Sequence, residues 1–293
     1  MTVLQSVLLG ILQGVGEFLP ISSSGHLAVA QNLFGLDEVP LLFDVFLHLA
    51  TLLAVCIFFR KKIWNLLKVF GRWIARKPKT TEDDYEDLLC GTEKAGRRTI
   101  LAIIIATVIT GGLGLITSKV IPELSIKVTC AGFIVTAALL IVSAIIERIN
   151  AKHAEYVTSM EGISAKKEPK GVSAIQSVVI GFMQGFGTLP GISRSGSTIA
   201  GALFSGVNRK AAGDFSFIVS IPAILGAFVL ELKDIGEVSS SIGTIPVIAG
   251  CAAAFVVGYA SLALLMKLIN RGKLQWFAAY LIPAGILGMI FLK

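Results

Sequence analysis

The chain has 293 residues, of which 54% are hydrophobic and only 15% are charged, and its mean hydropathy is +0.80. This composition excludes a soluble globular protein and is typical of a polytopic membrane protein. The net charge of +7 does not indicate nucleic-acid binding, because 21 of the 26 Lys and Arg residues fall in four regions between apolar segments. The positive-inside rule assigns these regions to the cytoplasmic side; they are 60–98, 148–170, 209–210 and 267–273.

The apolar segments are of two kinds. Four are short or broken by Gly, Pro and Ser, and we expect them to form re-entrant half-helices: Val3–Leu19, Leu27–Leu36, Val172–Leu189 and Thr198–Val207. Six approach the roughly 20 residues that a transmembrane helix needs. These predicted spans are Leu41–Phe59, Ile100–Thr117, Ile126–Ile146, Ala212–Leu230, Ile245–Met266 and Trp276–Leu292.

Three polar regions interrupt this order. The sequence from Lys61 to Lys77 has apolar residues at helical spacing among basic ones, which predicts an amphipathic helix on anionic lipid headgroups. The acidic stretch Glu82–Asp87 is expected to be a solvated loop. A polar linker at 151–170 divides the chain.

The sequence Gln13–His26 (QGVGEFLPISSSGH) recurs as Gln184–Ser197 (QGFGTLPGISRSGS), at an offset of 171. Each copy precedes three predicted spans, and an odd number of spans makes the second copy enter the membrane from the opposite face. We therefore predict an all-α, polytopic membrane protein with an inverted-topology repeat. Its single membrane domain would consist of residues 1–150 and 171–293, joined by the cytoplasmic linker.

The paired motifs predict an anion-binding site. Non-helical backbone at membrane depth is tolerated where it lines a cavity, and each motif carries Ser residues where a helix would restart with an N-cap. Two helix N-termini that meet near the middle of the membrane would favour a polyanion such as a phosphate group. The predicted substrate-binding residues are Ser22, Ser24, Gly25, Ser193, Ser195, Gly196 and Thr198.

Arg194 replaces Ser23 in the second copy and falls at membrane depth, where an Arg costs roughly 2.5 to 3.5 kcal/mol on insertion scales. A structural ion pair with Glu17 or an aspartate is one explanation. An anionic ligand is the one we favour, because a guanidinium group binds phosphate through two hydrogen bonds.

The first copy carries the reactive groups. Gln13 and Glu17 are four residues apart on one helix face, and His26 follows near the start of the next half-helix. A carboxylate and an imidazole beside a phosphate indicate metal coordination, acid–base catalysis, or both. With Ser23 as a possible nucleophile and Arg194 as a cationic clamp, such a site could hydrolyse a lipid phosphate.

Three further polar residues fall in or beside apolar spans. Asp44 and Asp214 stand at nearly equivalent repeat positions, and we expect them to support the site without touching the substrate. His48 has no role that the sequence assigns.

At these residues the chain resembles the undecaprenyl-diphosphate phosphatase family, also called bacitracin-resistance proteins. The family's (E/Q)-x-x-x-E motif is similar to Gln13–Glu17, its F-L-P-x-S-S-x-G-H stretch to Phe18–His26, and its P-G-x-S-R-S-x-x-T motif to Pro190–Thr198. The resemblance implies removal of one phosphate from the C55 isoprenyl diphosphate, which recycles the lipid carrier for cell-wall synthesis. It also implies dependence on Mg²⁺ or Ca²⁺, a bacterial plasma (inner) membrane location, a site open to the periplasmic face, and a homodimer.

Our hypothesis is that Arg194, the half-helix N-termini and a metal ion bound through Glu17, with Gln13 as a further candidate ligand, hold the diphosphate. The nucleophile is Ser23, His26 or a water molecule. The alternative is a lipid-phosphate flippase or transporter, since inverted repeats with broken helices are transporter architecture.

Overall fold

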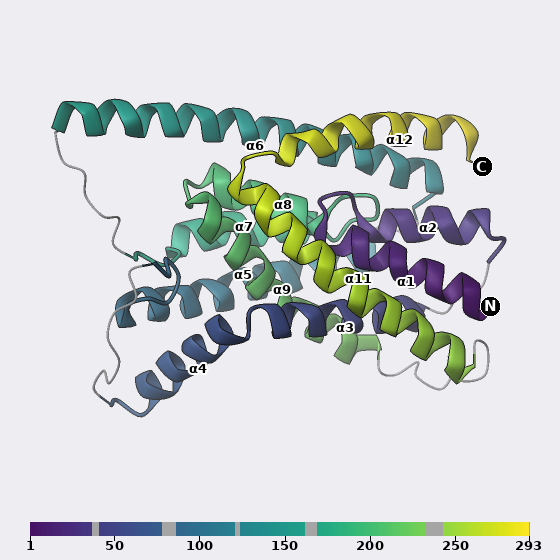
Figure 1. Cartoon of the computed structure of the whole chain (residues 1–293), viewed down its shortest axis with the longest axis horizontal. Coiled ribbons are helices and arrows are strands. Elements are labelled where there is room, and N and C mark those ends of the chain that lie inside the picture. The colour runs from purple at the N-terminus through teal and green to yellow at the C-terminus, as the bar shows by residue number, and fades with distance from the viewer. Residues whose placement is uncertain (37–40, 78–85, 121–123, 162–168, 232–242, 293) are drawn as a thin grey trace.

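The computed structural model describes residues 1–36, 41–77, 86–120, 124–161, 169–231 and 243–292. These residues form helices joined by turns (Figure 1), and the predicted fold class, an all-α polytopic membrane protein, is confirmed. Five described helices are long and apolar enough to cross a membrane, and a bent pair gives a sixth candidate span. The five are α5 (Glu93–Val120), α6 (Ile126–Glu161), α9 (Arg209–Glu231), α11 (Thr244–Asn270) and η2 with α12 (Leu274–Phe277 and Ala278–Phe291).

The bent pair comprises α3 (Leu41–Phe58) and α4 (Arg60–Ile74), which meet at 77°. The predicted apolar face of α4 divides in two. Leu66 and Val69 are buried, and Val69 lies over Gly96 of α5, whereas Trp64 is 60% exposed. One side of α4 therefore packs on the protein, and the other is free to meet lipid.

The four short helices occupy the predicted half-helix positions: α1 (Val3–Phe18), α2 (Ser23–Leu33), α7 (Ala174–Phe186) and α8 (Arg194–Phe204). α1 and α7 begin in the same way, with a capping box formed by Thr2 and Gln5 in one and by Ser173 and Gln176 in the other. In Figure 1, α1 runs inward from the edge where both termini lie, and α7 runs inward from the opposite edge, where α6 ends. The two pairs of half-helices therefore approach the centre from opposite ends.

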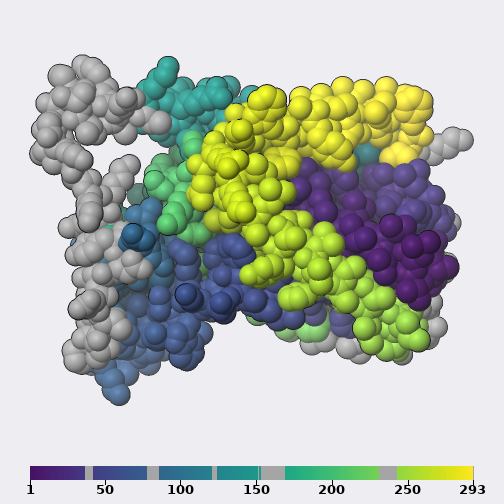
Figure 2. All heavy atoms as spheres, viewed as in Figure 1, coloured from purple at the N-terminus to yellow at the C-terminus, as the bar shows by residue number. Residues whose placement is uncertain are grey.

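Packing between the two halves is reciprocal. α1 lies along α11, and at the equivalent place α7 lies along α5, while α6 lies along α12. Glycines permit the first two contacts: a Cβ atom added to Gly10 would lie 2.2 Å from the Gly250 carbonyl oxygen, and one added to Gly181 would lie 2.9 Å from the Ala106 Cα. Figure 2 shows α11 crossing the inner end of α1. Each half thus covers the broken motif of the other.

The boundaries of the two halves stay predictions. α6 extends through Glu161, well into the predicted linker 151–170, and residues 162–168 of that linker lie outside the described residues. The expected solvated loop at Glu82–Asp87 is wrong for Asp87, which is 8% exposed and accepts a hydrogen bond from Lys62 Nζ at 3.2 Å. Residues 82–85 are outside the described part of the chain.

Candidate active site

The two motifs break and restart at equivalent places. α2 begins after Ser22, whose hydroxyl oxygen accepts a hydrogen bond from the Gly25 N–H at 3.3 Å, and α8 begins after Ser193, which accepts from the Gly196 N–H at 3.1 Å. The predicted N-caps are confirmed. Their helices start at Ser23 and Arg194, four residues earlier than the predicted half-helices, because the serines belong to the first turn.

The two breaks touch each other. Ser195 Oγ donates a hydrogen bond to the Phe18 carbonyl oxygen at 3.1 Å, and a Cβ atom added to Gly196 would lie 3.1 Å from Pro20 Cβ. Ser193 N–H also donates to Thr136 Oγ1 of α6 at 2.9 Å. The start of the second motif's helix is thus fixed against the end of α1, as the convergence of two helix N-termini on one site requires.

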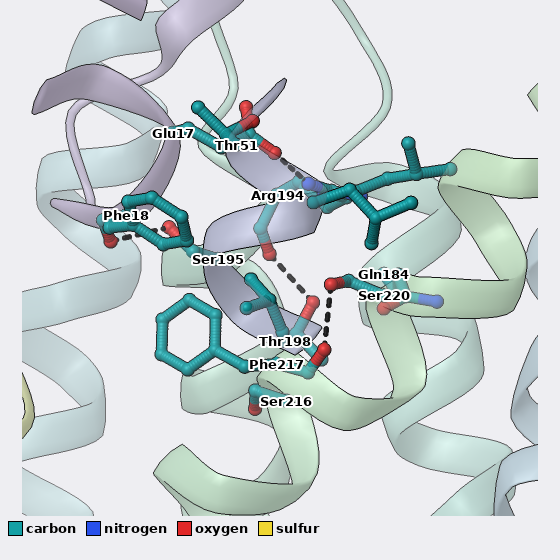
Figure 3. Close-up of a pocket in the computed structure, with 13 residues that line it drawn as sticks. Glu17, Phe18, Thr51, Gln184, Arg194, Ser195, Thr198, Ser216, Phe217 and Ser220 are labelled. Carbon is teal, nitrogen blue, oxygen red and sulfur yellow. Dashed lines mark hydrogen bonds and ion pairs between the residues drawn. The ribbon is translucent and has the colours of Figure 1, made fainter. Parts of the chain in front are cut away.

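Glu17 lies at the centre of this contact. It is 6% exposed, and its Oε1 atom accepts a hydrogen bond from Arg194 Nη2, 177 residues away in the sequence. Its Oε2 atom accepts from Ser23 Oγ at 2.8 Å and from Gln13 Nε2 at 3.0 Å. The structure therefore brings a carboxylate, a hydroxyl, an amide and a guanidinium group into one cluster (Figure 3 shows Glu17 and Arg194).

His48, which the sequence left unassigned, belongs to the same cluster. Its Nε2 atom lies 3.4 Å from Glu17 Oε2, and its Nδ1 atom contacts the Asp44 carbonyl oxygen at 2.8 Å. The Asp44 carboxylate accepts a hydrogen bond from Gln31 Nε2 at 3.0 Å. His48 thus links the backbone of Asp44 to the carboxylate of Glu17.

A polar pocket continues from Glu17 and Arg194 between α3, α8 and α9 (Figure 3). Ser216 Oγ and Gln184 Oε1, both buried, have no hydrogen-bond partner among the described residues. The free space is sufficient for about one water molecule and too small for a phosphate group. The other polar residues that line it are Thr51, Ser195, Thr198 and Ser220.

The remaining predicted residues make other contacts. Ser24 is exposed on α2 and Gly25 is buried against Phe133. Asp214 pairs with Lys62 Nζ at 2.7 Å, in the group that includes Asp87. His26 does not line the pocket; its ring nitrogens contact the Ser22 carbonyl oxygen and the Tyr280 hydroxyl.

Comparison with known proteins places this geometry in a family. The model of the bacitracin resistance protein BacA family matches residues 6–287. The chain belongs to this family. A protein named undecaprenyl-diphosphatase from Treponema denticola is 45% identical over 98% of this chain and 96% of its own length. Proteins of the same name from Desulfatibacillum aliphaticivorans and Alkaliphilus metalliredigens are 39% and 37% identical, over 94% and 99% of both chains, respectively.

Within the BacA fold, sequence reasoning missed the partners that come from distant helices. His48 was noticed as an ionisable residue in a span, but its contact with Glu17 was not predicted. Tyr280 of α12 and Lys62 of α4 were not singled out. An ionisable or hydroxyl group in an apolar span was the available signal for His48 and Tyr280, and the acid at 214 was a signal that a cation such as Lys62 would lie near it.

Proposed function

We propose that this chain removes the terminal phosphate of undecaprenyl diphosphate and releases undecaprenyl phosphate and inorganic phosphate. The function rests on membership of the BacA family and on the name of its curated relatives. The observation that carries the assignment of residues is the cluster in which Arg194 and Ser23 both contact Glu17. Regeneration of the lipid monophosphate returns the carrier to peptidoglycan synthesis, and the family name links the activity to bacitracin resistance.

Substrate binding exchanges one anion for another at Arg194. In the free site the guanidinium group neutralises Glu17, and the pocket has no room for phosphate. The terminal phosphate therefore draws Arg194 away from Glu17. It also accepts hydrogen bonds from the first-turn N–H groups of α2 and α8, because helix N-termini attract anions. The pairing in the free site accounts for how an Arg and a Glu are tolerated at membrane depth before substrate arrives.

The released Glu17 carboxylate then acts as the base. Ser23 Oγ already donates to Glu17 Oε2 at 2.8 Å, within the reach that proton transfer requires. A bond forms between Ser23 Oγ and the terminal phosphorus as the bond from that phosphorus to the bridging oxygen breaks. The lipid monophosphate leaves with the electron pair, and the Ser23 proton passes to Glu17.

His26 serves the second step. It is three residues from Ser23 in α2 and therefore on the same helix face. A water molecule attacks the phosphoserine, its proton passes to His26 Nε2, and inorganic phosphate leaves as Ser23 recovers its proton from Glu17. Charge neutralisation and positioning supply most of the catalysis, as in other phosphoryl transfers.

The residues of the cluster suit a divalent cation that is held mainly by the substrate. Mg²⁺ is commonly bound by one or two carboxylates together with substrate phosphates, and it prefers oxygen ligands. Glu17 offers a carboxylate, and Gln13 Oε1 is buried without a hydrogen-bond partner among the described residues. We propose that the Glu17 carboxylate and Gln13 Oε1 hold Mg²⁺ or Ca²⁺, which would neutralise charge on the diphosphate.

The site is proposed to open to the periplasmic face of the bacterial inner membrane. The described basic residues of α4, the start of α5 and the ends of α6 and α11 gather at one end of the molecule, which the positive-inside rule makes cytoplasmic (Figure 1). α2, which carries Ser23 and His26, runs toward the opposite end. We also propose a homodimer, to be tested by light scattering of the detergent-solubilised protein.

Release of inorganic phosphate from undecaprenyl diphosphate by the purified protein in detergent tests this function. Detergent abolishes the two compartments that transport needs, so phosphate release there requires hydrolysis. Absence of release, together with movement of the lipid across vesicle membranes, would instead support the flippase. Chelation of divalent cations should reduce the rate, and added Mg²⁺ or Ca²⁺ should restore it.

A further inference from the structure

The His26 side chain is held by three separate elements. Its ring stacks on Phe133 of α6, with centroids 4.6 Å apart and planes at 27°, and on Tyr280 of α12, with centroids 5.7 Å apart and planes at 22°. Its Nδ1 atom lies 2.8 Å from the Ser22 carbonyl oxygen, and its Nε2 atom lies 2.8 Å from the Tyr280 hydroxyl. Stacking and both hydrogen bonds together leave the imidazole a single orientation.

The two hydrogen bonds also select a tautomer. A carbonyl oxygen only accepts hydrogen bonds, so the proton on the neutral ring must reside on Nδ1, facing Ser22. The Nε2 atom then carries the lone pair, and the Tyr280 hydroxyl is its donor. The nitrogen that can accept a proton is therefore the one that Tyr280 contacts.

Tyr280 is well placed to act on His26 without blocking it. Tyr280 is 49% exposed, whereas Phe133 is 3% exposed. Phe133 is thus fixed in the core, and Tyr280 lies at an accessible surface of α12. The Tyr280 hydroxyl therefore keeps Nε2 turned toward that accessible side, where a water molecule can replace it during the reaction.

We propose that Tyr280 is a positioning residue for the reaction: its hydroxyl donates to His26 Nε2 and, together with the Ser22 carbonyl oxygen on Nδ1, fixes the ring so that Nε2 is the nitrogen presented to the water that hydrolyses the phosphoserine. This inference rests on the proposed function. It assigns to α12, the last helix of the chain, a part in a site whose other groups come from the two motifs and α3. It also explains why a Tyr with a polar hydroxyl stands in an otherwise apolar helix.

Replacement of Tyr280 by Phe tests the proposal, because it removes the hydroxyl and retains the stacked ring. Tyr259→Phe is the matched control. Tyr259 is in α11, its ring packs edge-on against Phe58, and its hydroxyl has no hydrogen-bond partner among the described residues. We expect Tyr280→Phe to lower kcat for phosphate release on the order of tenfold with little change in KM. Tyr259→Phe should match the unsubstituted protein in rate, and both variants should match it in thermal stability.

Two further measurements separate positioning from a merely structural role. In protein labelled with ¹⁵N-histidine, the signals that disappear in His26→Gln belong to that ring. We expect its Nε2 signal to shift in Tyr280→Phe because the hydroxyl donor is lost, whereas Nδ1 keeps its proton on the Ser22 carbonyl oxygen. In a His26→Gln background, Tyr280→Phe should cause no further loss of activity. An unchanged Nε2 signal, a rate equal to that of Tyr259→Phe, or a full additional loss in the His26→Gln background would each overturn the proposal. The proposed function itself is judged separately, by phosphate release from the unsubstituted protein.

Discussion

The motifs Gln13–His26 and Gln184–Ser197 share a backbone plan and differ in chemistry. Both end a half-helix, turn, and restart a helix from a serine N-cap. The first contributes Glu17, Ser23 and His26, whereas the second has Thr188, Arg194 and Ser197 at the equivalent positions. The repeat therefore supplies a pair of helix N-termini, and divergence of a few side chains makes one half the source of reactive groups and the other the source of the cation.

The turns themselves reveal a second difference. A residue with positive φ is needed in each, and the second motif uses Gly191 at φ +84°, whereas the first uses Ser22 at φ +71°. Such a conformation costs a non-glycine residue of order 1–3 kcal/mol. The strained Ser22 is also the residue whose carbonyl oxygen accepts from His26 Nδ1. The first motif thus retains strain where it positions a reactive group, and the second relieves it with glycine.

The cation of the second motif should have the largest effect on activity. Arg194→Ala leaves Glu17 buried without its partner and removes the clamp on the phosphate, so phosphate release should fall on the order of 10³-fold. Arg194→Lys keeps the charge without the planar pair of donors and should retain partial activity. Near-normal turnover of Arg194→Ala in the detergent assay would contradict the division of roles between the motifs.

The nucleophile of the first motif should come next. Ser23→Ala should lower the rate on the order of 10²-fold, because Glu17 can still activate a water molecule. It should also abolish the covalent phosphoenzyme that acid quenching traps from a ³²P-labelled substrate. The control is Ser118→Ala, which alters an exposed hydroxyl on α5, outside both motifs, and should leave trapping intact. Trapping that survives in Ser23→Ala and disappears in His26→Gln would transfer the nucleophile to His26.

The two turns should respond differently to substitution. Gly191→Ala requires a left-handed backbone and places a Cβ atom 1.8 Å from the Thr129 carbonyl oxygen, so it should lower stability by about 3 kcal/mol. Ser22→Gly should change stability by less than about 1 kcal/mol, since relief of strain offsets the lost cap.

Gly206→Ala separates the cost of a left-handed backbone from the cost of close packing at Gly191. Gly206 has φ +78° and open space around it, so its substitution reports the backbone cost alone, which should be about 1 kcal/mol. Thermal unfolding of the variants in one detergent measures all three changes. Equal losses for Gly191→Ala and Gly206→Ala would show that close packing at Thr129 is unimportant.

The smallest predicted effect concerns Asp87, the acid that shares Lys62 with Asp214. Asp44 and Asp214 stand at near-equivalent repeat positions but have different partners. Asp44 has an amide partner, Gln31, whereas Asp214 has the Lys62 ammonium, which also pairs with Asp87. Burial alone would raise the pKa of Asp87, but the Cys90 thiol, Lys62 and the Leu89 N–H stabilise its charged form and lower that pKa below the ordinary value of 3.8. Asp87 therefore contributes stability that is present above pH 3.8 and is lost as the pH falls through the lowered value.

Asp87→Asn should thus be less stable than the unsubstituted protein at pH 7, and the difference should shrink below pH 3.8. Melting temperatures across this range, in a detergent that does not titrate, provide the measurement. A difference that stays constant with pH would exclude charge as the source of the stability.

Sequence alone was sufficient for the membrane class, the broken motifs, the N-caps and the prominence of Glu17 and Arg194. These depend on properties that act along the chain: apolar length, the loss of helix at Gly and Pro, and the spacing of a serine before a helix. The recurrence at an offset of 171 also made it possible to predict that the two motifs would converge.

The tertiary structure decided which groups touch. His26 was predicted beside the phosphate site, and only the packing of α12 against α6 places Tyr280, 254 residues away, on its Nε2 atom. The same holds for His48 on Glu17 and Lys62 on Asp214, whose contacts arise from helix crossings. A sequence pattern identifies the face of a helix that is buried, but the rotation and depth at which two helices pack determine which side chains meet.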